Sequence, residues 1–522
     1  IRHAWKACRE NIPRGFESRP LRHYKVKTMT SKTKKQSGKH LVIVESPAKA
    51  RTVGSYLGND YVVMASGGHI RDLPEGRLGV DVSEEFTPEY VIMKGKKSVM
   101  ADLKKQARQS DSIYLATDPD REGEAISWHL KEAAGWQNKP VRRVVFHEIT
   151  PEAVQSAFEN DREIDMGLVN AQQARRILDR LVGYQLSPLL WSKVRRGTSA
   201  GRVQSVALRM AVEREREIGG FIPQEYWSLK SLLKTQDGIK GQEFEAGYYG
   251  IVGERKRQVL SSEPEVSAIR DDLIGAQYSV QSVVRRQEKR RPAAPFITST
   301  LQQEAWRQLR MSASRTMAVA QQLYDGVPVD SDGTVGLITY MRTDSPQLAP
   351  RAIEETRKFI QDRYGKSYLP SSVRRYSSKS KVAQEAHEAI RPTSVFRDPD
   401  TVRPFLVRDQ FRLYELIWKR LVASQMADTI LDAIRIEILA SCASGRTYSF
   451  RASGSTVNFP GFRTVYMEAK DDATPDSEEE ISQEKFPPLE KDQVLTCVST
   501  ATDQHFTDPP PRFTEASLIR KL

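Results

Sequence analysis

The fold of this chain is decided by the stretch Ile113-Tyr114-Leu115-Ala116-Thr117-Asp118-Pro119-Asp120-Arg121-Glu122-Gly123-Glu124. Its apolar first part predicts a buried strand, and the pattern from Ala125 to Leu130 predicts a helix. We therefore expect Asp118, Asp120 and Glu122 to project from the C-terminal end of a strand. That edge is where open α/β sheets place their ligands.

Two interpretations of these acids remain open on this stretch alone. Three carboxylates at one strand end repel one another unless a positive group lies among them, and a hard divalent cation such as Mg²⁺ takes oxygen ligands. The alternative is a solvated acidic turn that caps the next helix, because acids suit the positive N-terminal end of a helix. The rest of the chain has to decide between a metal site and a cap.

The length and charge of the chain limit its class. At 522 residues it must hold several domains, because single cores rarely exceed roughly 250–300 residues. The net charge of +13 suggests a nucleic-acid partner, but residues 1–40 hold twelve Lys and Arg against two acids, which leaves an excess of only three for the rest. No apolar run is long enough to cross a bilayer, so no membrane partner is expected.

The cysteines exclude two kinds of site within this chain. Cys8, Cys442 and Cys497 are far apart, and no C-x₂-C pair exists. We therefore expect no zinc ribbon and no disulfide framework here. A reducing intracellular compartment fits this cysteine usage best.

The first 39 residues are basic and lack helix or strand periodicity. A disordered arm, a transit peptide and upstream sequence outside the mature protein are all compatible with them. A transit peptide should also be Ser-rich, which this stretch is not. The favoured interpretation is a true start at Met29, which would leave residues 1–28 outside the mature protein.

A second strand followed by an acid lies upstream. Leu41 to Val44 is apolar and ends at Glu45, and Ser46-Pro47 then predicts a helix N-cap with proline at the first helical position. This places Glu45 at a strand end and Lys49 beside a helix N-terminus, where an anion can be held. A third strand is predicted at Val144–Phe146, and all three are expected in one sheet.

The remainder divides by periodicity. Residues from about 150 to 215 read as helical, with Arg176 and Arg180 four apart on one face. They lead into Ser199–Ser205, where small residues between Arg and Gln allow a backbone to approach phosphates closely. Residues 220–290 and 428–500 read as antiparallel strands around a mainly helical segment, which indicates one domain inserted into another. A last helical pattern begins near Thr514.

A tyrosine motif follows within that inserted segment. Gly336-Leu337-Ile338-Thr339-Tyr340-Met341-Arg342-Thr343-Asp344-Ser345 puts Tyr340 and Arg342 on one face of an extended backbone. A tyrosine hydroxyl becomes a useful nucleophile only where cations stabilise the phenolate and the phosphate that it attacks. A tyrosine in an apolar run is more often a core or interface residue, so the motif alone leaves both roles open.

Taken together, these segments resemble type IA DNA topoisomerases, most closely bacterial topoisomerase I. The likeness runs from about residue 40 to the end of the chain, and its segments occur in family order. They are Leu41–Ala50, Gly68–Pro74, Thr117–Glu124, Ala174–Gly183, Ser199–Ser205, Pro295–Gln303, Leu337–Ser345 and Ala383–Pro392. Primases and some nucleases share an acid triad of this sort, but they lack the tyrosine segment and the Ser-Ala-Gly-Arg-Val-Gln segment.

The resemblance implies a multidomain fold of α/β, α and β parts, in which a Toprim α/β domain precedes a toroidal type IA core. The expected divisions are a basic disordered tail (1–39), a Toprim metal-binding domain (40–150), the first part of a helical DNA-binding domain (151–219), the first part of a β-rich arch (220–291), an inserted helical domain carrying the tyrosine (292–427), the second part of the arch (428–500), and a truncated return to the helical DNA-binding domain (501–522).

The resemblance also implies a reaction. A tyrosine cuts one DNA strand and forms a 5′-phosphotyrosyl link, a strand passes through the gap, and the break is resealed, which relaxes negatively supercoiled DNA. The implied catalytic residues are Tyr340, Arg342, Glu45, Lys49 and His387. The implied Mg²⁺ ligands are Glu45, Asp118 and Asp120, with Glu122 a weaker candidate. The implied DNA-binding residues are His69, Arg176, Arg180, Gln185, Ser192, Ser199, Ala200, Gly201, Arg202, Val203, Gln204 and Arg342.

Further expectations follow for cofactors and partners. The chain has no G-x-x-x-x-G-K-[ST] phosphate loop, and the reaction conserves bond energy, so no ATP is expected. The expected partner is DNA with single-stranded segments in the cleavage groove, bound by a cytoplasmic, nucleoid-associated monomer. The family ordinarily continues beyond Pro511–Leu518, so this chain is expected to relax DNA poorly. An inactive single-strand-binding remnant and a Toprim nuclease or primase are the alternative functions.

Overall fold

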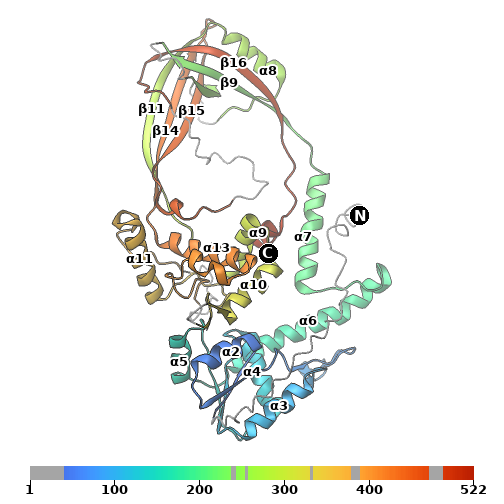
Figure 1. Cartoon of the computed structure of the whole chain (residues 1–522). Helices are drawn as coiled ribbons and strands as arrows, with labels where there is room; N and C mark the ends of the chain where they lie inside the picture. The colour runs from blue at the N-terminus through green and yellow to red at the C-terminus, as the bar shows by residue number, and fades with distance from the viewer. Residues whose placement is uncertain (1–39, 237–242, 253–256, 330–332, 378–387, 470–485) are drawn as a thin grey trace. The chain divides into compact units, whose positions relative to one another are not determined.

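The computed structural model describes residues 40–522 except 237–242, 253–256, 330–332, 378–387 and 470–485 (Figure 1). The predicted basic tail lies outside the described residues. Within them, no helix is both long and apolar enough to cross a membrane. The described residues form four parts in chain order: a parallel sheet with helices, a pair of long helices, a β-barrel, and a helical segment that carries the tyrosine motif and lies between strands of the barrel.

The first sheet brings the two predicted strand-to-acid turns together. Its four strands are all parallel, in the order β2 (Tyr61–Ala65), β1 (His40–Val44), β7 (Ser112–Leu115) and β8 (Val141–Arg143). Because β1 pairs directly with β7, with Ile43 opposite Leu115, the residues after both strands reach the same edge. Apolar side chains of β1 and β7 are buried on both faces, which explains their nearly continuous hydrophobic runs.

The third predicted strand was misplaced by three residues. Pairing with β7 occurs at Val141–Arg143, and Val144–Phe146 lies beyond the strand. Val144 and Phe146 are nonetheless buried, because their side chains join the cluster that contains the tyrosine motif. The apolar pattern of Val144–Phe146 therefore predicted burial correctly, but it did not predict which residues pair with β7.

The helices of this region are α2 (Pro47–Tyr56), α3 (Lys97–Arg108), α4 (Arg121–Ala134) and α5 (Pro151–Glu159). The predicted cap of α2 is confirmed, since the Ser46 side chain accepts a hydrogen bond from the backbone of Lys49. Helix α4 begins earlier than predicted, with Asp120 as its N-cap, so Glu122 lies in the first helical turn rather than at the strand end. An N-cap carboxylate and acids in that turn suit the helix dipole.

The segment predicted to be helical after residue 150 forms two long helices, α6 (Met166–Lys193) and α7 (Arg202–Gly219). Helix α6 contacts α4, which ties it to the first sheet. Helix α7 has no buried residue, and Val203 and Leu208 are 60% and 65% exposed. The Ser199–Gly201 segment lies between these two helices.

The predicted antiparallel strands are present and close into a barrel. Around the barrel the order is β10 (Phe244–Ile251), β15 (Thr447–Phe459), β14 (Thr429–Ser441), β11 (Gln277–Arg290), β16 (Val494–Phe506) and β9 (Glu225–Thr235). Strands from before and after the helical segment pair with each other in the barrel, β10 with β15, β11 with both β14 and β16, and β9 with β16. Closure leaves the barrel without long open edges.

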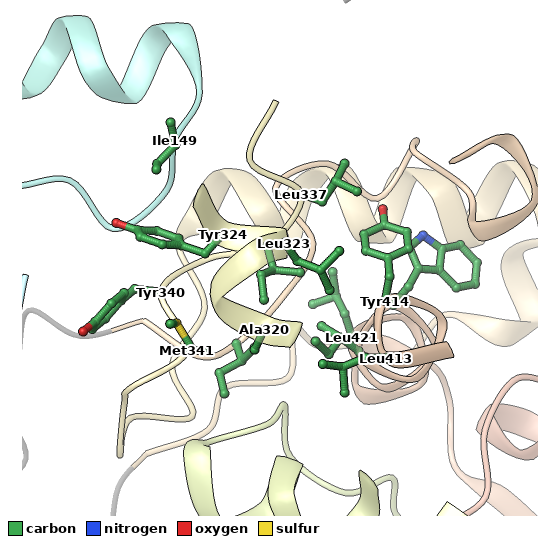
Figure 2. Packing of buried hydrophobic residues seen from close by; sticks show 14 of the residues in the cluster. Ile149, Ala320, Leu323, Tyr324, Leu337, Tyr340, Met341, Leu413, Tyr414 and Leu421 are labelled. Carbon is green, nitrogen blue, oxygen red and sulfur yellow. The ribbon is translucent and has the colours of Figure 1, made fainter. Parts of the chain in front are cut away.

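The helical segment between β11 and β14 packs around a large hydrophobic cluster. Its main helices are α9 (Thr298–Leu309), α10 (Ala313–Asp325), α11 (Pro350–Tyr364) and α13 (Arg408–Gln425). Figure 2 shows Leu323 and Leu337 packed beside Leu413 and Leu421, with Tyr324 and Tyr340 at one end of this cluster. The same cluster includes Val42, Val44 and Phe146 of the first sheet region, so hydrophobic packing is continuous between the two.

Short elements complete the chain. They are β3 (Arg71–Asp72), β4 (Val80–Asp81), β5 (Thr87–Pro88), β6 (Val91–Ile92), α8 (Glu263–Asp272), β12 (Val327–Pro328), β13 (Thr334–Val335), η2 (Lys366–Tyr368), α12 (Pro399–Val402), η3 (Arg403–Phe405), η4 (Gly461–Thr464) and α14 (Glu515–Lys521). The helix predicted near Thr514 is confirmed as α14, which is capped by the Thr514 side chain.

Candidate active site

The acid loop, residues 117–124, connects β7 to α4 in a tight turn. Thr117 donates its hydroxyl proton to the carbonyl of Gly123 at 2.6 Å, which closes the loop on itself. A Cβ atom at Gly123 would lie 2.2 Å from the carbonyl oxygen of Asp118 and 2.8 Å from its nitrogen. Only glycine therefore allows the first turn of α4 to pack directly over the backbone that carries Asp118.

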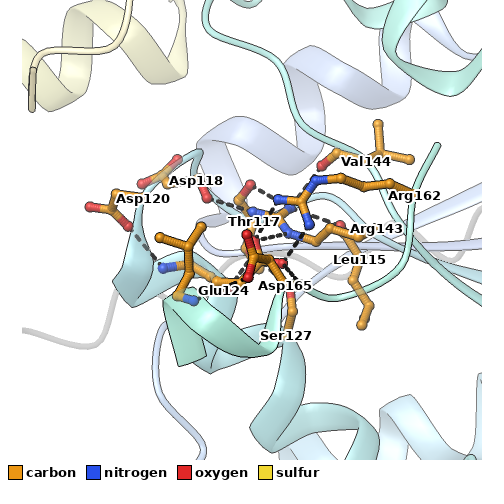
Figure 3. A network of polar contacts seen from close by, with 12 residues as sticks. Leu115, Thr117, Asp118, Asp120, Glu124, Ser127, Arg143, Val144, Arg162 and Asp165 are labelled. Carbon is orange, nitrogen blue, oxygen red and sulfur yellow. Dashed lines mark hydrogen bonds and ion pairs between the residues drawn. The ribbon is translucent and has the colours of Figure 1, made fainter. Parts of the chain in front are cut away.

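A buried arginine holds the other side of this loop (Figure 3). Arg143, the last residue of β8, is fully buried and donates through Nε to Glu124 at 2.9 Å. Its remaining nitrogens donate to four carbonyl oxygens, those of Leu115, Thr117, Asp118 and Val144, at 2.6 to 2.9 Å. Sequence reasoning missed this residue, because Arg143 stands beside a second arginine, Arg142, and just before the apolar run where the strand was predicted.

Glu45, Asp118 and Lys49 form a buried group at the sheet edge. The Asp118 backbone donates to Glu45 Oε1 at 3.2 Å, and Lys49 Nζ donates to Asp118 Oδ1 at 2.8 Å. Burial, followed by the adjacent Asp118 carboxylate, raises the pKa of Glu45 to about 8. Burial also acts to raise the pKa of Asp118, but Lys49, the hydrogen bond with Glu45 and the charge of Arg342 together outweigh it, and the net shift is downward. At neutral pH the proton of this pair therefore resides on Glu45, and Asp118 is charged.

The tyrosine motif meets the acid loop. The Tyr340 hydroxyl donates to Asp120 Oδ2 at 2.7 Å, although the two residues are 220 positions apart in the sequence. Arg342 Nη1 lies 3.7 Å from the same oxygen. Tyr340 is 4% exposed and packs edge-on against Tyr324, with ring centroids 5.2 Å apart. Burial, followed by Asp118 and Asp120, raises the pKa of Tyr340, so the phenol is protonated in this arrangement.

The predicted metal ligands are only partly assembled. Glu45 and Asp118 are in contact, whereas Asp120 uses Oδ1 to accept from the Gly123 backbone and Oδ2 to accept from Tyr340. Within the described residues, no three His, Cys, Asp or Glu side chains are arranged to hold a metal ion. The donor chemistry nevertheless fits Mg²⁺, because the predicted ligands Glu45, Asp118 and Asp120 are all carboxylates, and Mg²⁺ prefers oxygen ligands.

Two of the predicted DNA-binding arginines hold protein groups in this structure. Arg176 makes two hydrogen bonds to the carboxylate of Asp72, at 2.8 and 2.6 Å. Arg180 is buried and donates to the carbonyls of Leu73, Pro74 and Arg77. Both therefore anchor the Gly-rich segment 66–77 to α6. His69 of that segment is about one-third exposed and lies 3.4 Å from Glu122.

The other predicted DNA-binding positions are more open. Gln185, Ser192, Ser199, Val203 and Gln204 are exposed, and Ala200, Gly201 and Arg202 are partly exposed. Arg202 donates to Asp179 at 2.6 Å, which joins α7 to α6. His387 lies outside the described residues, so its position relative to Tyr340 is not defined.

Comparison with known proteins shows the family of this chain. Residues 163–522 match the family profile described as DNA topoisomerase, and residues 40–149 match that of the Toprim domain. The structure of full-length topoisomerase I from Thermotoga maritima is similar to this chain, with a TM-score of 0.75 and 38% sequence identity over 92% of this chain and 74% of that one. This chain belongs to the bacterial type IA DNA topoisomerases.

The family assignment confirms the resemblance seen in the sequence. This topoisomerase has a Toprim domain followed by a type IA core, and it is an isomerase that acts on DNA. Toprim domains generally bind Mg²⁺, and the carboxylates of the acid loop lie in the Toprim segment.

Replacing Gly123 by alanine is expected to disrupt the acid loop of this topoisomerase. The new methyl group would overlap the Asp118 backbone, and displacement by about 1 Å can cost on the order of a hundredfold in rate. DNA cleavage measured with purified Gly123→Ala should fall by about that factor. Gly54→Ala is the matched control, because a Cβ at Gly54 in helix α2 meets only Val63 at 3.6 Å. Equal activity of both variants would contradict a packing role for Gly123.

Proposed function

We propose that this topoisomerase cleaves one DNA strand by attack of Tyr340 Oη on phosphorus. The new Oη–P bond forms as the bond from phosphorus to the 3′-oxygen breaks, which leaves a 5′-phosphotyrosine and a 3′-hydroxyl. Passage of another strand and the reverse reaction would then relax negatively supercoiled DNA. The observation that carries this proposal is the hydrogen bond of the Tyr340 hydroxyl to Asp120 in the acid loop.

Two carboxyl groups are placed to take up and release the protons of this phosphoryl transfer, those of Asp120 and Glu45. Asp120 already accepts the hydrogen bond of the Tyr340 hydroxyl and is placed to accept its proton as attack begins. Glu45 carries a proton at neutral pH, because its pKa is raised to about 8, and can donate it to the departing 3′-oxygen. Religation reverses both transfers, so Glu45 and Asp120 each act as acid in one direction and as base in the other.

The charges of the exchange also have partners. Arg342 is half-exposed beside Tyr340, from where its guanidinium can reach a bound phosphate. Lys49 balances Asp118 and keeps that carboxylate ionised. We propose that Glu45 and Asp118 would hold Mg²⁺ after Glu45 has given up its proton, and that Asp120 would join them only after losing the proton taken from Tyr340. The ion would supply positive charge that aligns the two ends of the broken strand.

No nucleotide fuel is required by this scheme. Exchange of a phosphodiester for a phosphotyrosine roughly conserves bond energy, and the strain of underwound DNA provides the driving force. We further propose that the enzyme acts as a monomer and binds the single strand along the exposed positions of α6, α7 and the Ser199–Gly201 segment. Contacts there would be to the backbone, with little base readout.

Covalent trapping with end-labelled single strands tests this function. The full chain is incubated with an oligonucleotide and Mg²⁺, denatured, and separated by electrophoresis. Label at the 3′ end should migrate with the protein, and label at the 5′ end should not, because the protein holds the 5′ phosphate of the downstream fragment. A pattern with the two labels exchanged would contradict the chemistry. Bound DNA without adduct would indicate a binding remnant, and broken strands without adduct would indicate a nuclease.

A further inference from the structure

The Tyr340 segment is held between two other segments. On one side, the Thr339 backbone donates to the carbonyl of Arg391, and the Arg391 backbone donates to Thr339 Oγ1, both at 2.9 Å. On the other side, the Tyr340 backbone donates to the carbonyl of His147 at 2.8 Å. The His147 side belongs to residues 146–149, which follow β8 at the end of the Toprim segment. We call residues 146–149 the Toprim seat of the tyrosine.

The side chain of Arg391 bridges the same two sides. It is 6% exposed, and its Nη2 donates to Glu148 Oε2 of the Toprim seat at 2.8 Å. The guanidinium also donates to both carboxylate oxygens of Glu388 and, through Nη1, to the carbonyl of Pro392. Burial acts to lower the pKa of Arg391, but Glu388 and Glu148 outweigh it and the net shift is upward.

The seated tyrosine is closed to substrate. Tyr340 is 4% exposed, and its hydroxyl is occupied by Asp120. A phosphate of a DNA strand can reach Oη only if Tyr340 moves away from Asp120, and such a movement away from the Toprim segment also strains the contacts with the seat in that same segment. The contacts between the tyrosine and the seat must therefore be strong enough to place Tyr340 against the acid loop and weak enough to part.

The ion pair of Arg391 with Glu148 can open at low energetic cost, because each charged group has a second partner. Parting a buried ion pair is usually costly because one charge is left without a partner in a low-dielectric environment. Here Arg391 keeps Glu388 and the Pro392 carbonyl, which travel with its own segment. The Glu148 side chain is 23% exposed and also accepts from the Thr150 hydroxyl. When the ion pair opens, Arg391 therefore keeps its hydrogen bonds to Glu388 and Pro392, and Glu148 keeps its hydrogen bond from Thr150 and its contact with solvent.

We propose that Arg391 is a positioning residue whose reversible ion pair with Glu148 seats Tyr340 on the Toprim segment and releases it for DNA entry. This inference rests on the proposed role of Tyr340 as nucleophile. It assigns different tasks to the two acids that flank one guanidinium: Glu388 keeps Arg391 folded into its own segment, and Glu148 controls the seat.

Hydrogen exchange of the DNA-free chain tests the assignment independently of cleavage. In Glu148→Gln, the backbone amides of residues 336–341 should exchange about fivefold faster or more, because the seated state is weakened. The Tm should change by less than about 2 °C, because Arg391 retains Glu388. Glu355→Gln, which removes an exposed ion pair with Arg351 on α11, is the matched control and should change neither quantity.

A second variant separates seating from plain stability. Glu388→Gln should lower the Tm clearly more than Glu148→Gln, since Glu388 also accepts from the Ala349 backbone. Wild-type exchange rates in Glu148→Gln would overturn the proposal. An equal loss of Tm in the two variants would also overturn it, because the pair would then be purely structural. Because these readouts involve no DNA, their failure is distinguishable from a failure of the cleavage chemistry.

Discussion

Replacing Tyr340 by phenylalanine is expected to abolish the covalent protein–DNA adduct while the fold and DNA binding persist. The phenylalanine ring retains the packing against Tyr324 and the rest of the buried cluster, and the variant loses only the hydroxyl that donates to Asp120. Without that oxygen no phosphotyrosine can form, so the adduct should fall by at least roughly a thousandfold. Denaturing electrophoresis with a 3′-labelled oligonucleotide measures this, and a gel-shift assay measures binding.

Tyr414→Phe provides a matched control for that experiment. Tyr414 is buried in the same hydrophobic cluster, at the opposite end from Tyr340 in Figure 2, and donates its hydroxyl to the carbonyl of Arg397. Loss of one buried hydrogen bond there costs on the order of 1 kcal/mol and should leave the adduct unchanged. If Tyr340→Phe still formed the adduct at the level of Tyr414→Phe, another residue would be the nucleophile.

The sheet edge was predictable from local sequence. Two short apolar runs that end in acids, at Glu45 and Asp118, indicate parallel strands whose ends meet, and β1 does pair with β7. The cap at Ser46 was predictable for the same reason, because its chemistry involves only residues within one turn. The cap depends only on neighbours in the chain, whereas the pairing of β1 with β7 was inferred from two separate local signals, each an apolar run that ends in an acid.

The meeting of Tyr340 with Asp120 could not be derived in that way. Periodicity and spacing carry no information about a contact across 220 residues, so the expectation came from the resemblance of whole segments to a family. Composition likewise treats arginine as a surface residue. Arg180 and Arg143 are buried instead, because folding brings carbonyl groups from distant segments to their guanidinium groups. The number of acceptors around an arginine is a property of the fold.

Arg143→Met is the change expected to affect stability most. Methionine approximates the arginine stem in a buried site, but it cannot donate to Glu124 or to the four carbonyls that Arg143 now satisfies. Glu124 keeps Arg162 as a partner and the Leu115 carbonyl keeps the Val144 backbone N–H, so the main cost is the loss of the hydrogen bonds to the carbonyls of Thr117, Asp118 and Val144. We expect a loss of about 3–5 kcal/mol, which corresponds to a Tm lower by on the order of 10 °C.

The neighbouring arginine makes this prediction specific. Arg142 precedes Arg143 in β8 but points to the opposite face, where its side chain is 44% exposed and pairs with Asp161 and Glu163. Thermal unfolding of Arg142→Met should therefore match wild type, because water replaces surface ion pairs at little cost. If the two methionine variants unfolded at the same temperature, the guanidinium of Arg143 would not be what holds the acid loop. The loop geometry would then depend on Gly123, the cap at Asp120 and the hydrogen bond of the Thr117 hydroxyl to the Gly123 carbonyl.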